Sequence, residues 1–216
     1  MAGITPKYKV VFWTKISRIF IRFIIRNIYR IITRVHFTGW KNLPEDKAFV
    51  VAFNHVSYFE PPLLMSFWRP PPEAIGAEYL FTHPVFRILA IGYKAIPVNR
   101  GQYDRKVLQT CIDILESGRT LLIAPEGTRS KEKAMNQANS GISYIVDKVQ
   151  VPVVPVACIG TTNDMLKKVL KFKRPVVEVK IGKPLELQKI EGRGQQRRDE
   201  RQRNADYVMT KIAQMS

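Results

Sequence analysis

Short runs of apolar, mostly β-branched residues alternate with helical patterns along the chain from about residue 48 onward. Strands that are apolar along their whole length are typical of a sheet covered on both faces, and helices between them allow neighbouring strands to run parallel. The pattern therefore predicts an α/β fold, a single domain with a largely parallel central sheet flanked by helices. We expect strands at Ala48–Phe53, Ala74–Ala77, Ala95–Val98, Leu121–Ala124, Val153–Ala157 and Val176–Ile181, and helices near Pro62–Trp68, Pro84–Ile91, Asp104–Ser117, Gly141–Lys148 and Ala205–Met215.

The N-terminal part of the chain has a different pattern, because residues 10–35 mix Ile, Phe and Val with regularly spaced arginines. The spacing predicts an amphipathic helix or a helical pair. Arginines through its middle would be costly at the centre of a bilayer, and they also distinguish the segment from a signal peptide. An arginine occupies every fourth position here: Arg18, Arg22, Arg26, Arg30 and Arg34.

We therefore expect residues 1–40 to form a basic membrane-associating arm and residues 41–216 to form the α/β domain. In this interpretation the arm lies in the membrane interface, with apolar side chains in the acyl boundary and arginines on anionic headgroups. The alternative is a surface helix that packs on the domain and keeps its arginines in water.

The charge of the whole chain also indicates an anionic partner. The 216 residues include 35 Lys and Arg against 18 Asp and Glu, a formal net charge of +17. Such an excess favours a membrane surface, a phosphorylated substrate or nucleic acid. A second basic cluster lies at 167–174, whereas the polar run 189–203 also contains acids and is expected to be a solvated linker or helix face. Cys111 and Cys158 lack the spacing of a zinc site or a disulfide framework, so we expect no metal and a reducing compartment.

Candidate chemistry begins where the first expected strand ends, in the sequence NHVSYFE at residues 54–60. Across a strand-to-helix turn, Glu60 can reach one ring nitrogen of His55 while the other nitrogen faces a substrate. A carboxylate in that place fixes the tautomer and stabilises the imidazolium, so we predict His55 as a general base and Glu60 as its partner. Asn54 and Ser57, which can hydrogen-bond around the same turn, are assigned to substrate binding. Taken alone, a histidine such as His55 is more often an ordinary loop or core residue than a base.

Two further polar clusters follow later strands, in AIPVNRG at 95–101 and PEGTRS at 125–130. Neither has the glycine pattern of a Walker A or dinucleotide-binding loop. A glycine allows close approach of the backbone, and an arginine offers a guanidinium fork that matches phosphate. Ligands of open α/β sheets bind beyond the carboxyl ends of the strands, so we expect both clusters to converge with His55. The predicted substrate-binding residues in them are Arg100, Glu126, Gly127, Thr128 and Arg129.

In this order and at these intervals, the segments NHVSYFE, AIPVNRG, APEGTRS and VPVVPVA resemble the four signature blocks of the glycerolipid acyltransferase family. Its best-known members are 1-acylglycerol-3-phosphate (lysophosphatidic acid) acyltransferases. The resemblance covers roughly residues 36–185. It implies transfer of a fatty acyl group from acyl-CoA or acyl-carrier protein, as co-substrate and without another cofactor, to a hydroxyl of a lyso-phospholipid. The first candidate acceptor is 1-acylglycerol-3-phosphate, which would give phosphatidic acid.

The resemblance also implies roles for individual residues and a place in the cell. His55 corresponds to the family's general base and Glu60 to the acid that orients it, whereas Arg100 and residues 126–129 correspond to groups associated with the acceptor phosphate. The block around Val153–Pro155 is usually taken to shape the substrate pocket. Because the acceptor is a lipid, we expect the protein at the cytoplasmic face of a membrane.

Two positions depart from the family pattern. Glu60 stands where most members have aspartate, and Asn139 stands where many have the lysine of a Lys-x-Gly sequence. These departures leave open an acyltransferase for another lyso-lipid, or a catalytically silent basic protein that binds a membrane surface. Arginines interleaved with so many aliphatic side chains argue against a nucleic-acid-binding arm, and no nucleic acid partner is expected.

Overall fold

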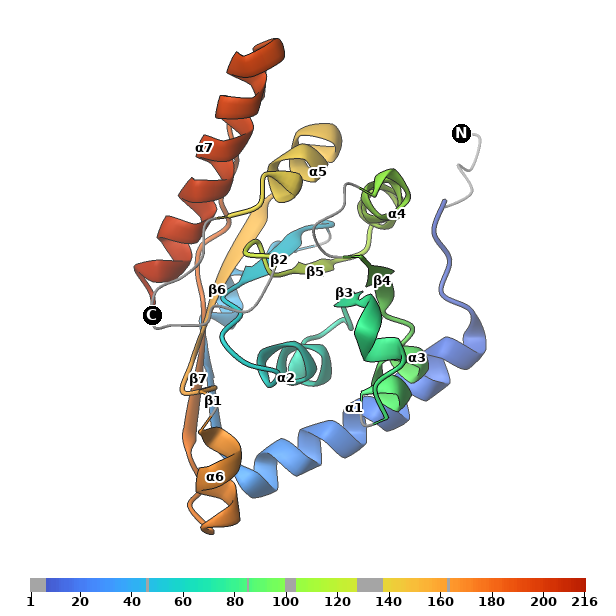
Figure 1. The fold of residues 1–216 in the computed structure, drawn as a ribbon, viewed down its shortest axis with the longest axis vertical. Coiled ribbons are helices and arrows are strands. Elements are labelled where there is room, and N and C mark those ends of the chain that lie inside the picture. The colour runs from blue at the N-terminus through green and yellow to red at the C-terminus, as the bar shows by residue number, and fades with distance from the viewer. Residues whose placement is uncertain (1–6, 46, 85, 100–103, 128–137, 163) are drawn as a thin grey trace.

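The structure is a computed structural model, and it describes residues 7–45, 47–84, 86–99, 104–127, 138–162 and 164–216. Within these residues the strands are β1 (Arg34–Thr38), β2 (Val50–Phe53), β3 (Glu73–Ala77), β4 (Ile96–Val98), β5 (Leu121–Ile123), β6 (Val153–Ile159) and β7 (Val176–Ile181). They form a seven-stranded sheet in the order β1-β7-β6-β2-β5-β3-β4 (Figure 1). Neighbouring strands are parallel except for β6 and β7, so the predicted, largely parallel sheet is confirmed.

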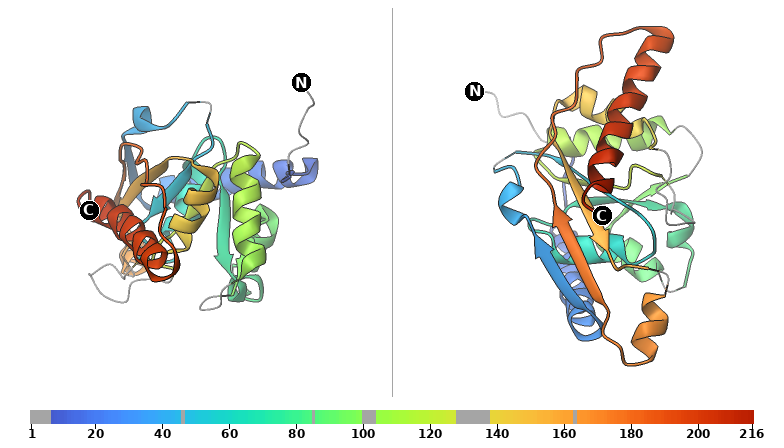
Figure 2. Two further views of the ribbon diagram at one scale, coloured as in Figure 1. Left: turned by 90° about the horizontal axis from the view of Figure 1, so that it is seen from above. Right: turned by 90° about the vertical axis from the view of Figure 1, so that its left-hand side faces the viewer.

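Helices cover both faces of this sheet (Figures 1 and 2). Successive residues of a strand point to opposite faces, and β2 contributes to a separate core on each side. Val51 and Phe53 pack with α1, α2, α3 and α6, whereas Val50 and Ala52 pack with α4, α5 and α7. The described helices are α1 (Phe12–Ile32), α2 (Glu60–Phe67), α3 (Arg87–Tyr93), α4 (Arg105–Glu116), α5 (Gly141–Val149), α6 (Met165–Leu170) and α7 (Gly194–Ala213), with short 3-10 turns η1 (Trp40–Asn42) and η2 (Glu78–Phe81).

All six expected strands and all five expected helices of the α/β domain are present, with shifted ends. Asp104 caps α4, because its carboxylate accepts the backbone N–H groups of Lys106 and Val107, as the sequence indicated. Helix α6 was not expected. Helix α7 begins at Gly194, inside the polar run 189–203, so that run forms the first half of a helix rather than a linker.

The division at residue 40 needs a correction, because β1 lies within the expected arm and belongs to the sheet. It pairs in parallel with β7 over its whole length, from Arg34 opposite Val176 to Thr38 opposite Lys180. The α/β domain therefore begins before residue 41.

Helix α1 packs on α2 and α3, and its arginines take part in this contact beside Tyr29, which is buried in the core, and Ile25, which packs against it. Arg22 donates to the carbonyl oxygens of Met65 and Trp68, and Arg26 donates to that of Ser66. These carbonyls belong to the last turn of α2, where helix geometry leaves them without intrahelical partners and carries partial negative charge. The two guanidinium groups therefore cap the end of α2.

Arg18 anchors the same helix to the sheet. Its guanidinium is buried and forms two hydrogen bonds, of 2.8 and 2.6 Å, with the fully buried carboxylate of Glu73 at the start of β3. Arg119 and the hydroxyl of Tyr8 donate to the same carboxylate, at 2.7 and 2.9 Å. Burial alone would raise the pKa of Glu73, but these partners, Arg18 first, hold that pKa below its ordinary value.

The expected contact of these arginines with lipid headgroups is therefore wrong for Arg18 and Arg22, and the alternative in which the arginines point into water is wrong for Arg18, Arg22 and Arg26. The side of α1 that faces away from the domain is apolar, with side chains 47–76% exposed. Among the described residues, no helix is long and apolar enough to cross a bilayer. The outward apolar side chains are Phe12, Trp13, Ile19, Phe20, Phe23, Ile24, Ile28 and Ile31.

Candidate active site

His55 lies directly beyond the carboxyl end of β2, on the turn that leads into α2. Nδ1 of His55 is 3.0 Å from Oε2 of Glu60, the first residue of α2. An ionised carboxylate only accepts hydrogen bonds, so Nδ1 carries the proton and Nε2 keeps a lone pair. The pair has the geometry of a base held by an acid.

Glu60 is fully buried and is held on several sides at once. Besides His55 it accepts hydrogen bonds from the backbone N–H of Ser57, at 3.1 and 3.0 Å to its two oxygens, and from the Ser57 hydroxyl, at 2.8 Å. Its place at the N-terminus of α2 adds the favourable end of the helix dipole. These donors give the buried side-chain oxygens of Glu60 the hydrogen-bond partners that burial away from water requires. The extra methylene of glutamate, relative to the family's aspartate, is thus accommodated.

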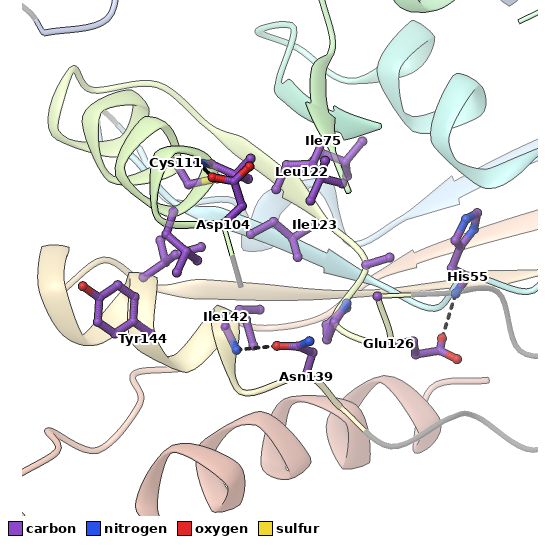
Figure 3. A pocket seen from close by; sticks show the side chains of 18 of the residues that line it. His55, Ile75, Asp104, Cys111, Leu122, Ile123, Glu126, Asn139, Ile142 and Tyr144 are labelled. Atoms are coloured by element: carbon purple, nitrogen blue, oxygen red, sulfur yellow. Dashed lines mark hydrogen bonds between the residues drawn. The ribbon is translucent and has the colours of Figure 1, made fainter. Parts of the chain in front are cut away.

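A second acid fixes the backbone of the histidine. Oε1 of Glu126 accepts the backbone N–H of His55 at 2.9 Å, and Glu126 itself is buried (Figure 3). Gly127, the next residue, has a φ of 65°, a left-handed conformation that favours glycine. Its N–H donates to the carbonyl of Ala124 at 3.0 Å, so the chain turns tightly at the end of β5. The third cluster is thereby brought against the first.

A cavity of about 550 Å³ begins at His55 and runs between the sheet and helices α4 and α5. Figure 3 shows His55 and Glu126 on one side of this cavity and Cys111 and Tyr144 on the other. Asn99 also lines it, so the described members of all three predicted clusters meet on one cavity. Most of the remaining wall is apolar, formed by residues such as Ile75, Val107, Leu108, Cys111, Leu122, Ile123, Ile142 and Ile145.

Three residues that we assigned to substrate contact are engaged with the protein instead. Asn54 bridges β2 to β6, since its side chain donates to the carbonyl of Cys158 at 3.0 Å and accepts that residue's N–H at 2.7 Å. Ser57 holds Glu60, and Glu126 holds the His55 backbone. A carboxylate would also repel a phosphate. The sharp turn after β2 leaves backbone N–H and C=O groups without hydrogen-bond partners inside the turn. These side chains therefore position the site.

The other predicted residues have a mixed outcome. Gly127 lies on the cavity, whereas Arg100, Thr128 and Arg129 fall outside the described residues. Asn139, at the position of the family's lysine, lines the cavity and accepts the N–H of Gly141 at 2.8 Å. Within the described part of the chain, no cluster of three or more His, Cys, Asp or Glu side chains could hold a metal ion.

One supporting residue, Tyr29 of α1, was not predicted from the sequence. Its hydroxyl donates to the carbonyl of Phe59 at 2.7 Å, immediately before Glu60, and burial, followed by the charge of Glu60, raises its pKa. The helix that we expected to be a separate arm therefore supports the turn that carries the acid. The cavity wall from α4 and α5 was also missed, although the apolar stripe of each helix indicated which side faces inward.

The comparisons with known proteins agree with what the geometry of the site indicates. A family model described as Acyltransferase matches residues 34–159. A chloroplastic 1-acyl-sn-glycerol-3-phosphate acyltransferase of Brassica napus is 31% identical over 137 residues, which are 59% of this chain and 38% of that protein. The 1-acyl-sn-glycerol-3-phosphate acyltransferase of Pseudomonas aeruginosa is 27% identical over 148 residues, 63% of this chain and 57% of that protein. The chain spans 38–44% of the length of the plant and algal relatives it matches.

A solved structure has the same fold. The crystal structure of the 1-acyl-sn-glycerophosphate acyltransferase PlsC from Thermotoga maritima superposes with a TM-score of 0.66 and 24% sequence identity. The match covers 91% of this chain and 80% of that one. It establishes the fold of the matched part of the chain.

Proposed function

Since this chain belongs to the acyltransferase family, we propose that it moves a fatty acyl group from a thioester donor to a hydroxyl of a lyso-phospholipid, with His55 as the general base. The observation that carries the proposal is the His55–Glu60 pair at the mouth of a largely apolar cavity. A base with a fixed tautomer beside a space for an aliphatic chain is what acyl transfer to an alcohol requires.

The chemistry follows from the protonation of the pair. Nε2 of His55 takes the proton of the acceptor hydroxyl as its oxygen attacks the thioester carbonyl carbon. The tetrahedral intermediate then breaks its C–S bond, and the imidazolium returns the proton to the leaving sulfur. The charge of Glu60 stabilises the imidazolium between these steps. Holding both substrates in line supplies much of the remaining rate enhancement.

The cavity suits the acyl chain of the donor. Its volume of about 550 Å³ is in the range of small-molecule sites, and its far wall is formed by aliphatic side chains together with Cys111. Burial raises the pKa of the Cys111 thiol to about 12, so this side chain stays neutral and acts as apolar lining. The donor is acyl-CoA or acyl-carrier protein, both of which present the chain as a thioester.

The acceptor that we propose first is 1-acylglycerol-3-phosphate, because the relatives quoted above bear that name. Arg100 and Arg129 remain the predicted partners of its phosphate. Glu126, which was predicted together with them, also holds the His55 backbone. Another lyso-phospholipid is the second candidate, favoured by Asn139 in place of the family's lysine.

We further propose that the protein binds the cytoplasmic face of a membrane through the outward side of α1. Contiguous exposed apolar side chains on one helix mark an interaction surface, and a lipid acceptor must be taken from a bilayer. The net charge of +17 adds attraction to an anionic surface.

One experiment tests the enzymatic proposal. Purified protein is given a radiolabelled acyl donor and a panel of lyso-phospholipids, and the products are resolved by chromatography. We expect His55→Ala to lower turnover by at least 10²–10⁴-fold, roughly the worth of general base catalysis, with an unchanged circular dichroism spectrum. The matched control is His36→Ala, on the exposed side of β1. Turnover retained in His55→Ala would remove the assigned base, and wild-type protein that binds vesicles without any turnover would support the silent membrane-binding alternative.

A further inference from the structure

A second, smaller pocket lies at the other end of α2 from His55. Its volume is about 360 Å³, and its walls are Arg26 and Arg30 of α1, Trp40 of η1, and Phe67 and Arg69 at the end of α2. Helix α2 spans the eight residues Glu60–Phe67, which places the pocket about 12 Å from Glu60 at 1.5 Å per residue. We call it the arginine pocket.

Three guanidinium groups converge on this pocket. Two of them stand over one aromatic ring, since the guanidinium carbons of Arg26 and Arg30 lie 5.6 and 6.0 Å from the centre of the Phe67 ring. Among the described residues, no carboxylate forms an ion pair with Arg26, Arg30 or Arg69. Partial burial lowers the pKa of Arg26, and the charges of Arg69 and Arg30 lower it further. The three cations repel one another, and an anion between them would relieve that repulsion.

Aromatic side chains hold the pocket open. The Phe67 ring stacks on Phe37 at 5.3 Å, Phe37 stacks on Trp40 at 5.2 Å, and Trp40 contacts the buried Trp68 at 5.4 Å between ring centres. This connected set of rings fixes Phe67 and Trp40 as walls of the pocket. Trp40 is 38% exposed, and partly exposed tryptophans are favoured at the headgroup level of membranes.

The pocket opens beside the apolar side of α1. Phe23 is 67% exposed and precedes Arg26 and Arg30 by about one and two turns, so it borders these arginines along the helix surface. An anion held in the pocket would therefore have lipid-facing side chains next to it. The basic cluster 167–174 adjoins the same end of α1, because Arg174 donates to the carbonyl oxygens of Arg30 and Thr33.

We propose that the arginine pocket binds the phosphate of an anionic phospholipid of the bilayer, separately from the acceptor beside His55. A guanidinium fork matches two phosphate oxygens, and the neighbouring Phe23 side chain would follow the glycerol backbone into the acyl layer. The site holds α1 at a fixed depth and rotation. It rests on the proposed membrane association and assigns to it a defined lipid contact.

The test compares two double variants that lose the same charge. Arg30→Gln with Arg69→Gln empties the pocket of its two exposed cations and leaves Arg26 in place as the cap of α2. Lys148→Gln with Arg198→Gln removes two exposed cations from α5 and the start of α7, at the opposite end of the molecule from α1 (Figures 1 and 2). Binding is measured by co-sedimentation with vesicles of phosphatidylcholine mixed with phosphatidylglycerol.

We expect the pocket variant to lose roughly 30-fold in vesicle affinity, about 5-fold for each guanidinium near an anionic surface. The control variant should lose less than about 2-fold, because its charges lie further from the membrane than the screening length. Equal losses in the two variants would overturn the proposal. Calorimetry with soluble sn-glycerol 3-phosphate distinguishes the two sources of the phosphate. If wild-type protein binds this compound in solution and the pocket variant does not, the proposal of a bilayer lipid is overturned in favour of a free phosphate ester.

Failure of the site and failure of the proposed function give different results. His55→Ala, tested on the same vesicles, leaves the pocket intact and should bind like the wild type. If the pocket proposal alone fails, the two double variants bind alike while wild-type protein still transfers acyl groups. If the enzymatic proposal alone fails, turnover is absent while the difference between the double variants persists.

Discussion

Glu73→Gln is expected to destabilise the protein by about 3–5 kcal/mol, the usual cost of removing one partner from a buried ion pair. The substitution keeps the shape of the side chain and removes its charge. The carboxylate is fully buried, and the Arg18 side chain that it neutralises is only 3% exposed. Arg18 would stay charged with no route to water, and the new amide group would turn an N–H₂ toward guanidinium donors.

Most of this cost belongs to Arg18. The other cation at the carboxylate, Arg119, is 30% exposed and can turn toward solvent, so its share is within about 1 kcal/mol. Arg18→Met added to Glu73→Gln removes the stranded charge, and a neutral apolar replacement for a buried pair often restores stability. The double variant should therefore be more stable than Glu73→Gln alone.

Urea unfolding followed by circular dichroism measures these differences, with Glu178→Gln on the exposed side of β7 as the control. The pKa of Glu73 is lowered in the folded protein, so its contribution is complete above the ordinary carboxyl range and disappears as pH falls through the lowered pKa. The gap between wild type and Glu73→Gln should thus narrow in acid. A loss below about 1 kcal/mol, or single-variant losses that simply add in the double variant, would refute the stranded-charge explanation.

Two further predictions concern the active site. Glu60→Gln keeps a hydrogen-bond acceptor for Ser57 but loses the charge beside His55. We therefore expect kcat to fall by about 10²–10⁴-fold, with little change in the KM for the acceptor. An unaltered kcat in the labelled-donor assay would show that Glu60 does not act through the imidazole. Cys111→Phe fills the cavity on the side away from His55, so the preferred acyl-chain length, measured with a series of donors, should become shorter. The control Cys111→Ala should leave turnover of short-chain donors unaffected. An unchanged chain-length preference in Cys111→Phe would place the acyl chain elsewhere.

The sheet and the histidine turn could be predicted because their signals are local. Strand β2 is buried along its whole length, and an apolar run of that kind has one common explanation. His55 and Glu60 are five residues apart on a single turn, so their meeting needed no knowledge of the rest of the fold. Strand β1 was missed for the opposite reason. Its residues alternate between exposed and half-buried, so the edge strand RVHFT carries no continuous apolar run.

The orientation of α1 could not be predicted, because periodicity separates two sides of a helix without saying which side faces the protein. The usual rule turns the apolar side inward. Here the groups that receive the helix are carbonyls at the end of α2 and the carboxylate of Glu73, which is 55 residues from Arg18 in sequence. The pattern of apolar and polar positions does not reveal a buried acid or an uncapped helix end, yet both of these groups favour arginine on the side of α1 that faces the protein. With Arg18 and Arg22 bonded to the protein, eight apolar side chains of α1, from Phe12 to Ile31, stay exposed, and they form the apolar surface by which we propose the helix meets the membrane.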